Sequence, residues 1–173
     1  MACSAEAGGF IRPARAGDAA AIARILRGDA CPHVLSETPE RTRARVREGL
    51  LFCGRDEGHT VFVAENGKGR AAGFVAVAWT RNLRFGIYGL VSELFVHSRW
   101  RGQGLGSRLL DAVKAEARRR GCQRLLYSKD GDPQRRGFYA KRFGRERGDA
   151  AFFVFHLNLE GDPLPPGALH PER

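Results

Sequence analysis

Residues 99–110 read RWRGQGLGSRLL, which sets three glycines at alternate positions (102, 104 and 106) ahead of an apolar helical stripe. Because glycine has no Cβ, it lets the backbone approach a ligand closely. A helix that begins directly after such a turn adds unsatisfied N–H groups and the positive end of its dipole. This stretch therefore predicts a cradle for a phosphate group.

The spacing of the glycines excludes two common phosphate-binding loops. A Walker A loop requires Gly-Lys followed by Ser or Thr, whereas Gly106 is followed by Ser107 and Arg108. The Rossmann pattern places its third glycine one position later and needs an acidic residue about 20 positions on, and the region around Gln123 has none. The pattern that fits is R-x-x-G-x-G, which starts at Arg101.

The composition is that of one globular domain in a reducing compartment. The 173 residues are 43% hydrophobic and 28% charged, which suits one core better than two. No apolar run approaches the roughly 18–20 residues that span a bilayer, and the N-terminus lacks the pattern of a secretory signal. The 4 cysteines form no C-x-x-C pair and lie near no His cluster. We therefore expect reduced thiols, no metal, no membrane contact and a cytoplasmic location.

The net charge of +10 has three interpretations, namely solvated helix faces, a small polyanionic ligand, or nucleic acid. Arginines are dense between residues 99 and 147, with short blocks at 118–120 and 135–136. A nucleic-acid surface would also need interleaved aromatic residues or a known reading motif. We take Trp100 and Tyr139 as the candidates for such aromatic residues and find no known reading motif, so we expect nucleic acid least.

The hydrophobic pattern predicts an α/β (α+β) fold in a single domain over residues 10–159. Residues 1–9 and 160–173 are expected to be flexible tails. Strands are predicted at 10–12, 60–64, 72–79, 87–96, 124–127 and 151–159. Helices are predicted from Asp18 as N-cap, and over 38–49, 104–120 and 133–143, with a loop at 31–37 and a tight hairpin turn at 65–70.

Around the glycine turn, the chain resembles the GCN5-related N-acetyltransferase (GNAT) superfamily. SELFVHSRW (92–100) is similar to the family's fourth strand and its exit, and the helix after the glycines is similar to its pyrophosphate-binding helix. GFYAKRFG (137–144) resembles its F-Y-x-x-x-G-F segment, with the last glycine one residue late. The resemblance implies a GNAT fold, in which about four helices flank a mixed central sheet of about six to seven strands.

The resemblance also implies acetyl-CoA as cosubstrate. The turn would hold its pyrophosphate, and its pantetheine arm would pair with the fourth strand like an extra strand. The cofactor-binding residues implied in this way are Leu94, Phe95, Val96, Arg101, Gly102, Gln103, Gly104, Leu105, Gly106, Ser107 and Asp132. At Asp132 many family members have Asn, and this residue has a second interpretation as the N-cap of a helix that starts at Pro133.

Two residues match the family's proton carriers. Glu93 is the carboxylate of an otherwise apolar strand, where desolvation would raise its pKa toward the range useful to a general base. The alternative is an edge-facing or ion-paired residue. Tyr139 matches the tyrosine that donates a proton to the CoA sulfur, and the alternative for it is ordinary packing of a helix aromatic.

The resemblance implies an N-acetyltransferase that acts by direct transfer in a ternary complex. The opening FIRPARAGD (10–18) is similar to polyamine and small-amine acetyltransferases, so we expect a small primary amine as acceptor. The alternatives are a protein N-terminal or lysine acetyltransferase and a non-catalytic module that binds acyl-CoA or nucleic acid; a homodimer also stays open. Candidates for the acceptor wall, each of which also fits surface solvation, are Asp29, Cys31, His33, Glu37 and Glu40.

Overall fold

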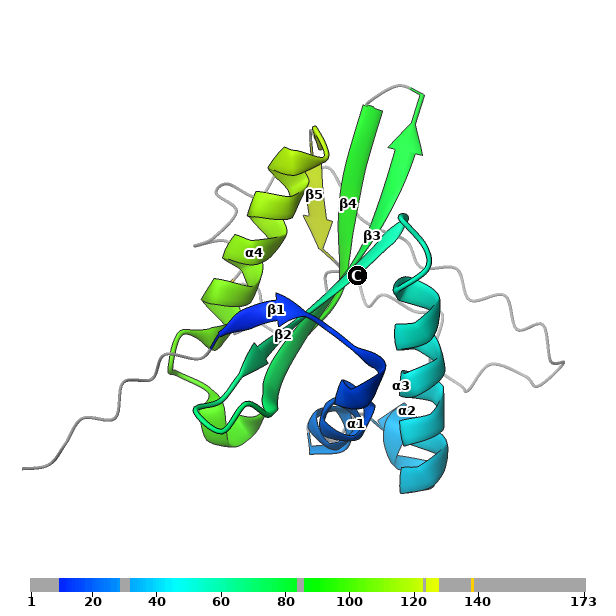
Figure 1. Ribbon diagram of the computed structural model, residues 1–173, viewed down its shortest axis with the longest axis vertical. Helices are drawn as coiled ribbons and strands as arrows, with labels where there is room; N and C mark the ends of the chain where they lie inside the picture. Colours follow the sequence, from blue (N-terminus) through cyan, green and yellow to red (C-terminus); the bar gives the residue numbers. More distant parts are fainter. Residues whose placement is uncertain (1–9, 29–31, 84–85, 123, 128–137, 139–173) are drawn as a thin grey trace, which may run out of the picture. The chain divides into compact units, whose positions relative to one another are not determined.

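The protein has a five-stranded sheet with helices on both of its faces (Figure 1). A computed structural model of the chain describes residues 10–28, 32–83, 86–122, 124–127 and 138. The strands and helices given below all lie in one compact unit, Met1–Ser128. In chain order they are β1 (Ile11–Pro13), η1 (Ala16–Asp18), α1 (Ala19–Gly28), α2 (Pro32–Leu35), α3 (Pro39–Cys53), β2 (His59–Glu65), β3 (Ala71–Asn82), β4 (Gly86–Val96), η2 (Ser98–Trp100), α4 (Leu105–Arg119) and β5 (Arg124–Tyr127).

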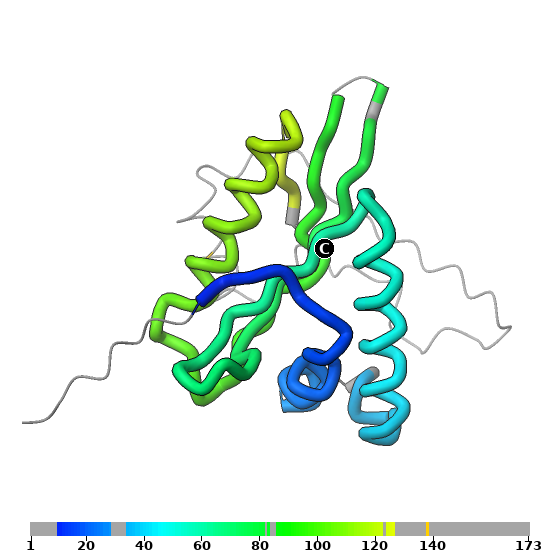
Figure 2. The backbone as a smooth tube through the Cα atoms, viewed as in Figure 1, coloured from blue at the N-terminus to red at the C-terminus, as the bar shows by residue number. Residues whose placement is uncertain are grey.

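The strands lie side by side in sequence order, from β1 to β5. Neighbours from β1 to β4 are antiparallel, and β5 is parallel to β4. The parallel pair requires a crossover, which α4 provides (Figure 2). The prediction of a mixed sheet with flanking helices is therefore confirmed, while the expected helix 133–143 and strand 151–159 lie outside the described residues.

Helix α4 covers one face of the sheet. Its apolar stripe, predicted from sequence spacing, is buried at all five positions, namely Leu105, Leu109, Leu110, Val113 and Ala117. Most of these side chains share a core with Val75 and Val77 of β3 and Val91 of β4. The prediction of this helix is confirmed, and its first turn is fixed against the sheet by the buried Leu105 side chain.

Helices α1 and α3 lie on the opposite face of the sheet (Figure 1). A second core there joins Ile22, Ile25 and Leu26 of α1 to Val63 and Phe74 of the sheet. Partly buried residues of α3 pack against this core. Within the described part of the chain, no helix is both long enough and apolar enough to cross a bilayer.

Three local predictions are wrong. Residues 31–37 contain the single-turn helix α2 rather than only a loop, and α3 continues to Cys53 rather than ending near 49. Asp18 is the last residue of η1 and not an N-cap. Its carboxylate accepts hydrogen bonds from the Arg15 N–H at 2.8 Å and from the Arg12 guanidinium at 2.8 and 2.9 Å, and this arrangement ties η1 to β1.

A tryptophan inside the sheet explains one glycine of β4. The Trp79 Nε1–H donates to the Thr60 hydroxyl at 2.9 Å. The guanidinium carbon of Arg120 lies 5.0 Å from the centroid of the Trp79 ring, in cation–π range. Gly89 lies opposite Trp79 in the register of β3 and β4, so the tryptophan ring occupies the space that a side chain at 89 would need.

Gly89→Ala is expected to destabilise the fold. The added Cβ would lie 2.5 Å from Cζ3 of Trp79 and 2.9 Å from Cδ2 of Leu125, and such overpacking costs about 1–3 kcal/mol. Thermal or urea unfolding measures the loss. In Gly49→Ala, a Cβ on helix α3 would meet no atom within 4 Å, so this control should gain up to about 1 kcal/mol. Equal stability of the two variants would contradict this packing.

Candidate functional site

The turn that connects β4 to α4 contains two glycines in the left-handed region. Gly102 has φ of 77° and Gly104 has φ of 78°, where a residue with a side chain is strained. A Cβ at either position would meet no atom within 4 Å. The backbone conformation, rather than lack of space, therefore requires glycine here, and the space beside the turn is open to a ligand.

The start of α4 presents unused hydrogen-bond donors at this turn. The first intrahelical bond runs from the Arg108 N–H to the Gly104 carbonyl at 3.1 Å. The N–H groups of Leu105, Gly106 and Ser107 precede that bond and have no acceptor within the helix. Together with the helix dipole, these donors suit a phosphate or pyrophosphate.

Two contacts fix the turn to the scaffold. The Arg101 Nε–H donates to the Val96 carbonyl at 3.0 Å, which links the turn to the last residue of β4. The Gln103 side chain is exposed and reaches the Arg99 carbonyl at 3.5 Å. The cradle is therefore held between the end of β4 and the buried start of α4.

The last residues of β4 have an edge that β5 does not cover in the described part of the chain. β5 pairs with Tyr88–Val91 only, whereas the pairing of β4 with β3 continues to Val96. Leu94 and Val96 pack against the core under α4, and the Phe95 ring stacks on Phe74 with centroids 5.6 Å apart. This edge leads from the middle of the sheet to the glycine turn, and its backbone is placed to pair with an extended ligand chain.

A bulge in β4 decides which way Glu93 faces. Val77 pairs with Val91 and Ala76 pairs with Glu93, so Ser92 is the extra residue. The Ser92 hydroxyl donates to the Ala76 carbonyl at 3.2 Å. Since side chains alternate along a strand, the extra residue moves Glu93 from the face of Val91 and α4 to the face of α1 and α3.

On that face, Glu93 is close to groups of α3. The residue is exposed, yet the protein atoms around its carboxyl desolvate it enough to raise the pKa, while the positive charge of Arg45 acts in the opposite direction. The pKa of the Cys53 thiol, also on α3, is raised by burial first, then by the Asp56 charge and last by the Glu93 charge. Glu93 thus combines access from solvent with a raised proton affinity, as a general base requires.

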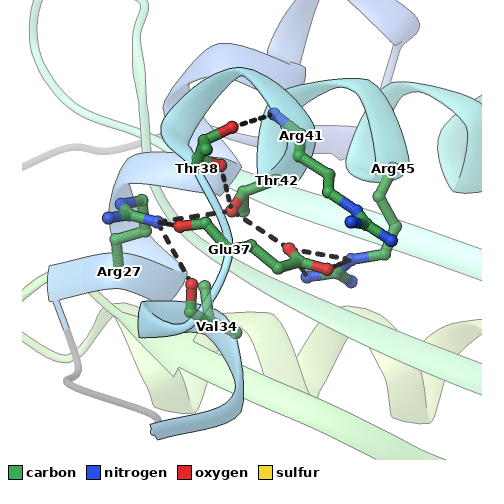
Figure 3. A network of polar contacts seen from close by, with 7 residues as sticks. All are labelled: Arg27, Val34, Glu37, Thr38, Arg41, Thr42 and Arg45. Atoms are coloured by element: carbon green, nitrogen blue, oxygen red, sulfur yellow. Dashed lines mark hydrogen bonds and ion pairs between the residues drawn. The ribbon is translucent and has the colours of Figure 1, made fainter.

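Glu37, a predicted acceptor-wall residue, is held in an ion pair (Figure 3). Its carboxylate accepts from Nε of Arg45 at 3.1 and 3.3 Å and from the Thr42 hydroxyl at 3.1 Å. These hydrogen bonds hold the pKa of Glu37 below its usual value, and the bond from Arg45 contributes most. Glu37 is therefore ionised and already partnered.

The other predicted site residues are only partly described. Glu40 is exposed in the first turn of α3, and His33 lies in α2. Asp29, Cys31, Asp132 and Tyr139 lie outside the described residues, so their roles stay predictions. Among the residues that the structure describes, no three His, Cys, Asp or Glu side chains are grouped to hold a metal ion.

Sequence reasoning missed three features of this site, namely the Ser92 bulge, Arg45 and Cys53. The bulge had a signal, since Ser92 and Glu93 are two consecutive polar residues within an apolar strand. Arg45 had none, because α3 carries arginine at 41, 43, 45 and 47 and only the fold selects one of them.

Comparison of the sequence with known proteins identifies an acetyltransferase family and one sequence relative. A model of the acetyltransferase (GNAT) family matches residues 22–144. Glucosamine 6-phosphate N-acetyltransferase 1 of Oryza sativa subsp. japonica is 39% identical over 107 residues, a match that spans 60% of this chain and 62% of that relative.

Solved structures share the fold at low sequence identity. A transcriptional regulator from Bacillus halodurans has a TM-score of 0.73 at 22% identity and covers 86% of this chain and 99% of its own. An aminoglycoside N-acetyltransferase in complex with CoA has a TM-score of 0.68 at 15% identity, and the match covers 90% of this chain and 99% of that chain.

Proposed function

Because the chain belongs to the GNAT acetyltransferase family, we propose that it transfers an acetyl group from acetyl-CoA to a primary amine of a small molecule. Transfer is direct, within a ternary complex that forms in the cytoplasm. The observation that carries this proposal is the bulge at Ser92, which turns Glu93 toward the α3 side at the end of the open β4 edge.

The chain's own residues fit acetyl-CoA. The left-handed glycines and the free N–H groups at the start of α4 supply donors for a pyrophosphate, as shown by their φ values and by the Arg108 to Gly104 bond. The open edge at 94–96 offers backbone groups to the pantetheine amides. The cosubstrate supplies an activated thioester, and the protein's task is to orient it and to move protons.

Glu93 is proposed as the general base. An alkyl ammonium has a pKa near 10.4, so a proton must leave the acceptor before its nitrogen can attack a carbonyl. Desolvation raises the pKa of Glu93, which strengthens it as a base, directly or through one water. Activity should therefore be lost as the pH falls through the pKa of Glu93, where the carboxylate becomes protonated.

Tyr139 is proposed as the acid that protonates the leaving thiolate, on the strength of its match to the family's tyrosine. In Tyr139→Phe the ring and its packing stay and only the hydroxyl is lost. We expect turnover to fall by roughly 10²-fold or more with little change in melting temperature. Steady-state kinetics beside a melting curve measure both effects, and unchanged turnover would remove Tyr139 from the mechanism.

Amino sugars are the first candidates for the acceptor. The relative from Oryza sativa is named for glucosamine 6-phosphate, and a structural neighbour is an aminoglycoside acetyltransferase. Glu37 is one of the acids expected to face a cationic amine. Its carboxylate already forms an ion pair with Arg45. This arrangement favours an acceptor with few positive charges, such as glucosamine 6-phosphate, over a polyamine or an aminoglycoside.

A thiol-release assay with acetyl-CoA tests the proposal directly. The acceptor panel is glucosamine, glucosamine 6-phosphate, an aminoglycoside, spermidine and two peptides, one with a free N-terminus and one with a lysine. We expect the highest kcat/KM with an amino sugar. Preference for a peptide would support a protein acetyltransferase instead. Tight CoA binding without thiol release on any acceptor would support a non-catalytic module.

A further inference from the structure

One arginine of α1 holds α2 and the link between α2 and α3 (Figure 3). Arg27 lies in the last turn of α1, and its Nη1 donates to the Glu37 carbonyl at 2.7 Å and to the Val34 carbonyl at 3.1 Å. Val34 belongs to α2, and Glu37 lies in the link that follows it. The Arg27 guanidinium therefore ties both segments to the end of α1.

The same link is also held from α3. The buried Thr42 hydroxyl donates to the Glu37 carboxylate at 3.1 Å and lies 3.5 Å from Nη1 of Arg27. The Arg45 guanidinium pairs with that carboxylate at 3.1 Å. Hydrogen bonds with a charged donor are stronger than neutral ones, and Arg27 is half-buried. The backbone and the side chain of Glu37 are therefore both fixed.

Helix α2 depends on contacts of this kind, because it is too short to be stable alone. It has 4 residues, Pro32–Leu35, whereas isolated helices shorter than about 12–15 residues are marginal in water. The Val34 side chain is buried in the core, and Arg27 binds the carbonyl of that same residue. Without the Arg27 guanidinium, two backbone carbonyls lose a charged donor and α2 loses one of its restraints.

The core that contains Val34 extends to the part of β4 that carries Glu93. Val34 and Phe74 belong to one buried cluster, against which Phe95 packs, and the Phe95 ring stacks on Phe74 with centroids 5.6 Å apart. Phe95 and Glu93 are two residues apart on β4, so their side chains leave the same face, roughly 7 Å apart along the strand. Helix α1 contacts both β3 and β4. These contacts join α2 to the end of β4 on the face that Glu93 faces.

We propose that Arg27 is a positioning residue for the amine acceptor, because it holds α2 in place as a wall of the acceptor site. An amine that reaches both Glu93 and a thioester at the open β4 edge must lie on this face, beside the end of β4. The described helices with side chains in the core of this face are α1, α2 and α3. Arg27 acts through α2 and not on the reacting atoms. This inference rests on the proposed function, and in particular on Glu93 as the base.

The test compares Arg27→Met with the wild type in the full chain. Methionine keeps a long side chain but has no donor for the two carbonyls. We expect faster hydrogen exchange at the amides of residues 33–38. With glucosamine 6-phosphate, or the panel amine with the highest kcat/KM, as acceptor, KM should rise by roughly 10–10²-fold. The kcat and the Kd of CoA should stay near their wild-type values, because the phosphate turn is fixed by the separate core under α4.

Arg24→Met is the matched control. Arg24 lies three residues earlier on α1 and its side chain is exposed, so its loss should change neither the exchange nor KM. Arg27→Lys keeps the charge, but its ammonium ends one bond short of the position of Nη1, so it should recover only part of the loss. If Arg27→Met does not fold, the comparison of Arg27→Lys with Arg24→Lys decides, since only the first should raise KM.

The inference is overturned if exchange at residues 33–38 stays at the wild-type rate in Arg27→Met, or if exchange speeds up while KM does not rise. An equal rise of KM in Arg24→Met also overturns it. A parallel loss of kcat and CoA affinity would show that Arg27 serves the fold as a whole and not the acceptor.

The proposed function fails by different results. If the wild type releases no thiol with any amine of the panel, the proposed function and this inference are both rejected. If Glu93→Gln keeps wild-type turnover, the assignment of the base is wrong. If the wild type is active, Glu93→Gln is inactive and Arg27→Met has a normal KM, the base stands and only the positioning role of Arg27 is rejected.

Discussion

Gly104→Val is expected to weaken acetyl-CoA binding by roughly 10²–10⁴-fold. Gly104 has φ of 78°, and a β-branched residue resists that conformation, so the N–H groups at the start of α4 would turn away from the ligand. Hydrogen bonds to charged groups contribute about 1.5–3 kcal/mol each. Losing two of them gives the stated range. Isothermal titration calorimetry on the folded variant measures the change.

Gly121→Val provides the matched control for backbone strain. Gly121 has φ of 63°, and a Cβ there would also meet no atom within 4 Å. It lies beyond the opposite end of α4, about 25 Å from Gly104 at 1.5 Å per helical residue. Both variants should lose similar stability, but only Gly104→Val should lose binding. Near-wild-type affinity in Gly104→Val would show that the turn does not hold the phosphates.

Glu93→Gln is expected to lower turnover by roughly 10²–10⁴-fold while leaving acetyl-CoA affinity largely intact. Glutamine keeps the size and polarity of the side chain but cannot accept a proton from the amine at neutral pH. The deficit should shrink at high pH, because the acceptor amine is then neutral without help. Steady-state kinetics across pH, with CoA affinity measured in parallel, test both parts.

Asp111→Asn is the matched control for Glu93→Gln. It removes a carboxylate from the exposed side of α4, which covers the face of the sheet opposite to the one that Glu93 faces. It should keep wild-type turnover at every pH. A Glu93→Gln variant that runs at the wild-type rate across the same range would rule out Glu93 as the base, although the fold and the phosphate cradle would stand.

The elements with strong periodicity could be predicted from the sequence. The sequence predicts a helix over 104–120, and α4 spans Leu105–Arg119, because its five apolar residues recur at helical spacing and form one buried stripe. The phosphate turn was predictable for a related reason, since glycine is the residue that adopts a left-handed backbone without strain. These features depend on residues that are close in sequence.

The missed features depend on residues that are far apart in sequence. Helix α2 has only four residues, too few for a periodic pattern, and it is held by Arg27 of α1 through the Val34 carbonyl. The Ser92 bulge is defined by its register with Ala76 on β3. The effect of the Arg45 charge on the pKa of Glu93 depends on the packing of α3 against the core on that face of the sheet, which no local pattern encodes.

The order of the strands has a consequence for folding. β2, β3 and β4 form consecutive antiparallel hairpins, so most of the sheet can assemble from contacts that are local in sequence. β5 can pair with β4 only after α4 has crossed the sheet. The phosphate turn and the open edge of β4 lie where this early meander meets the later crossover. We therefore expect the ligand site to be the last part of this unit to form.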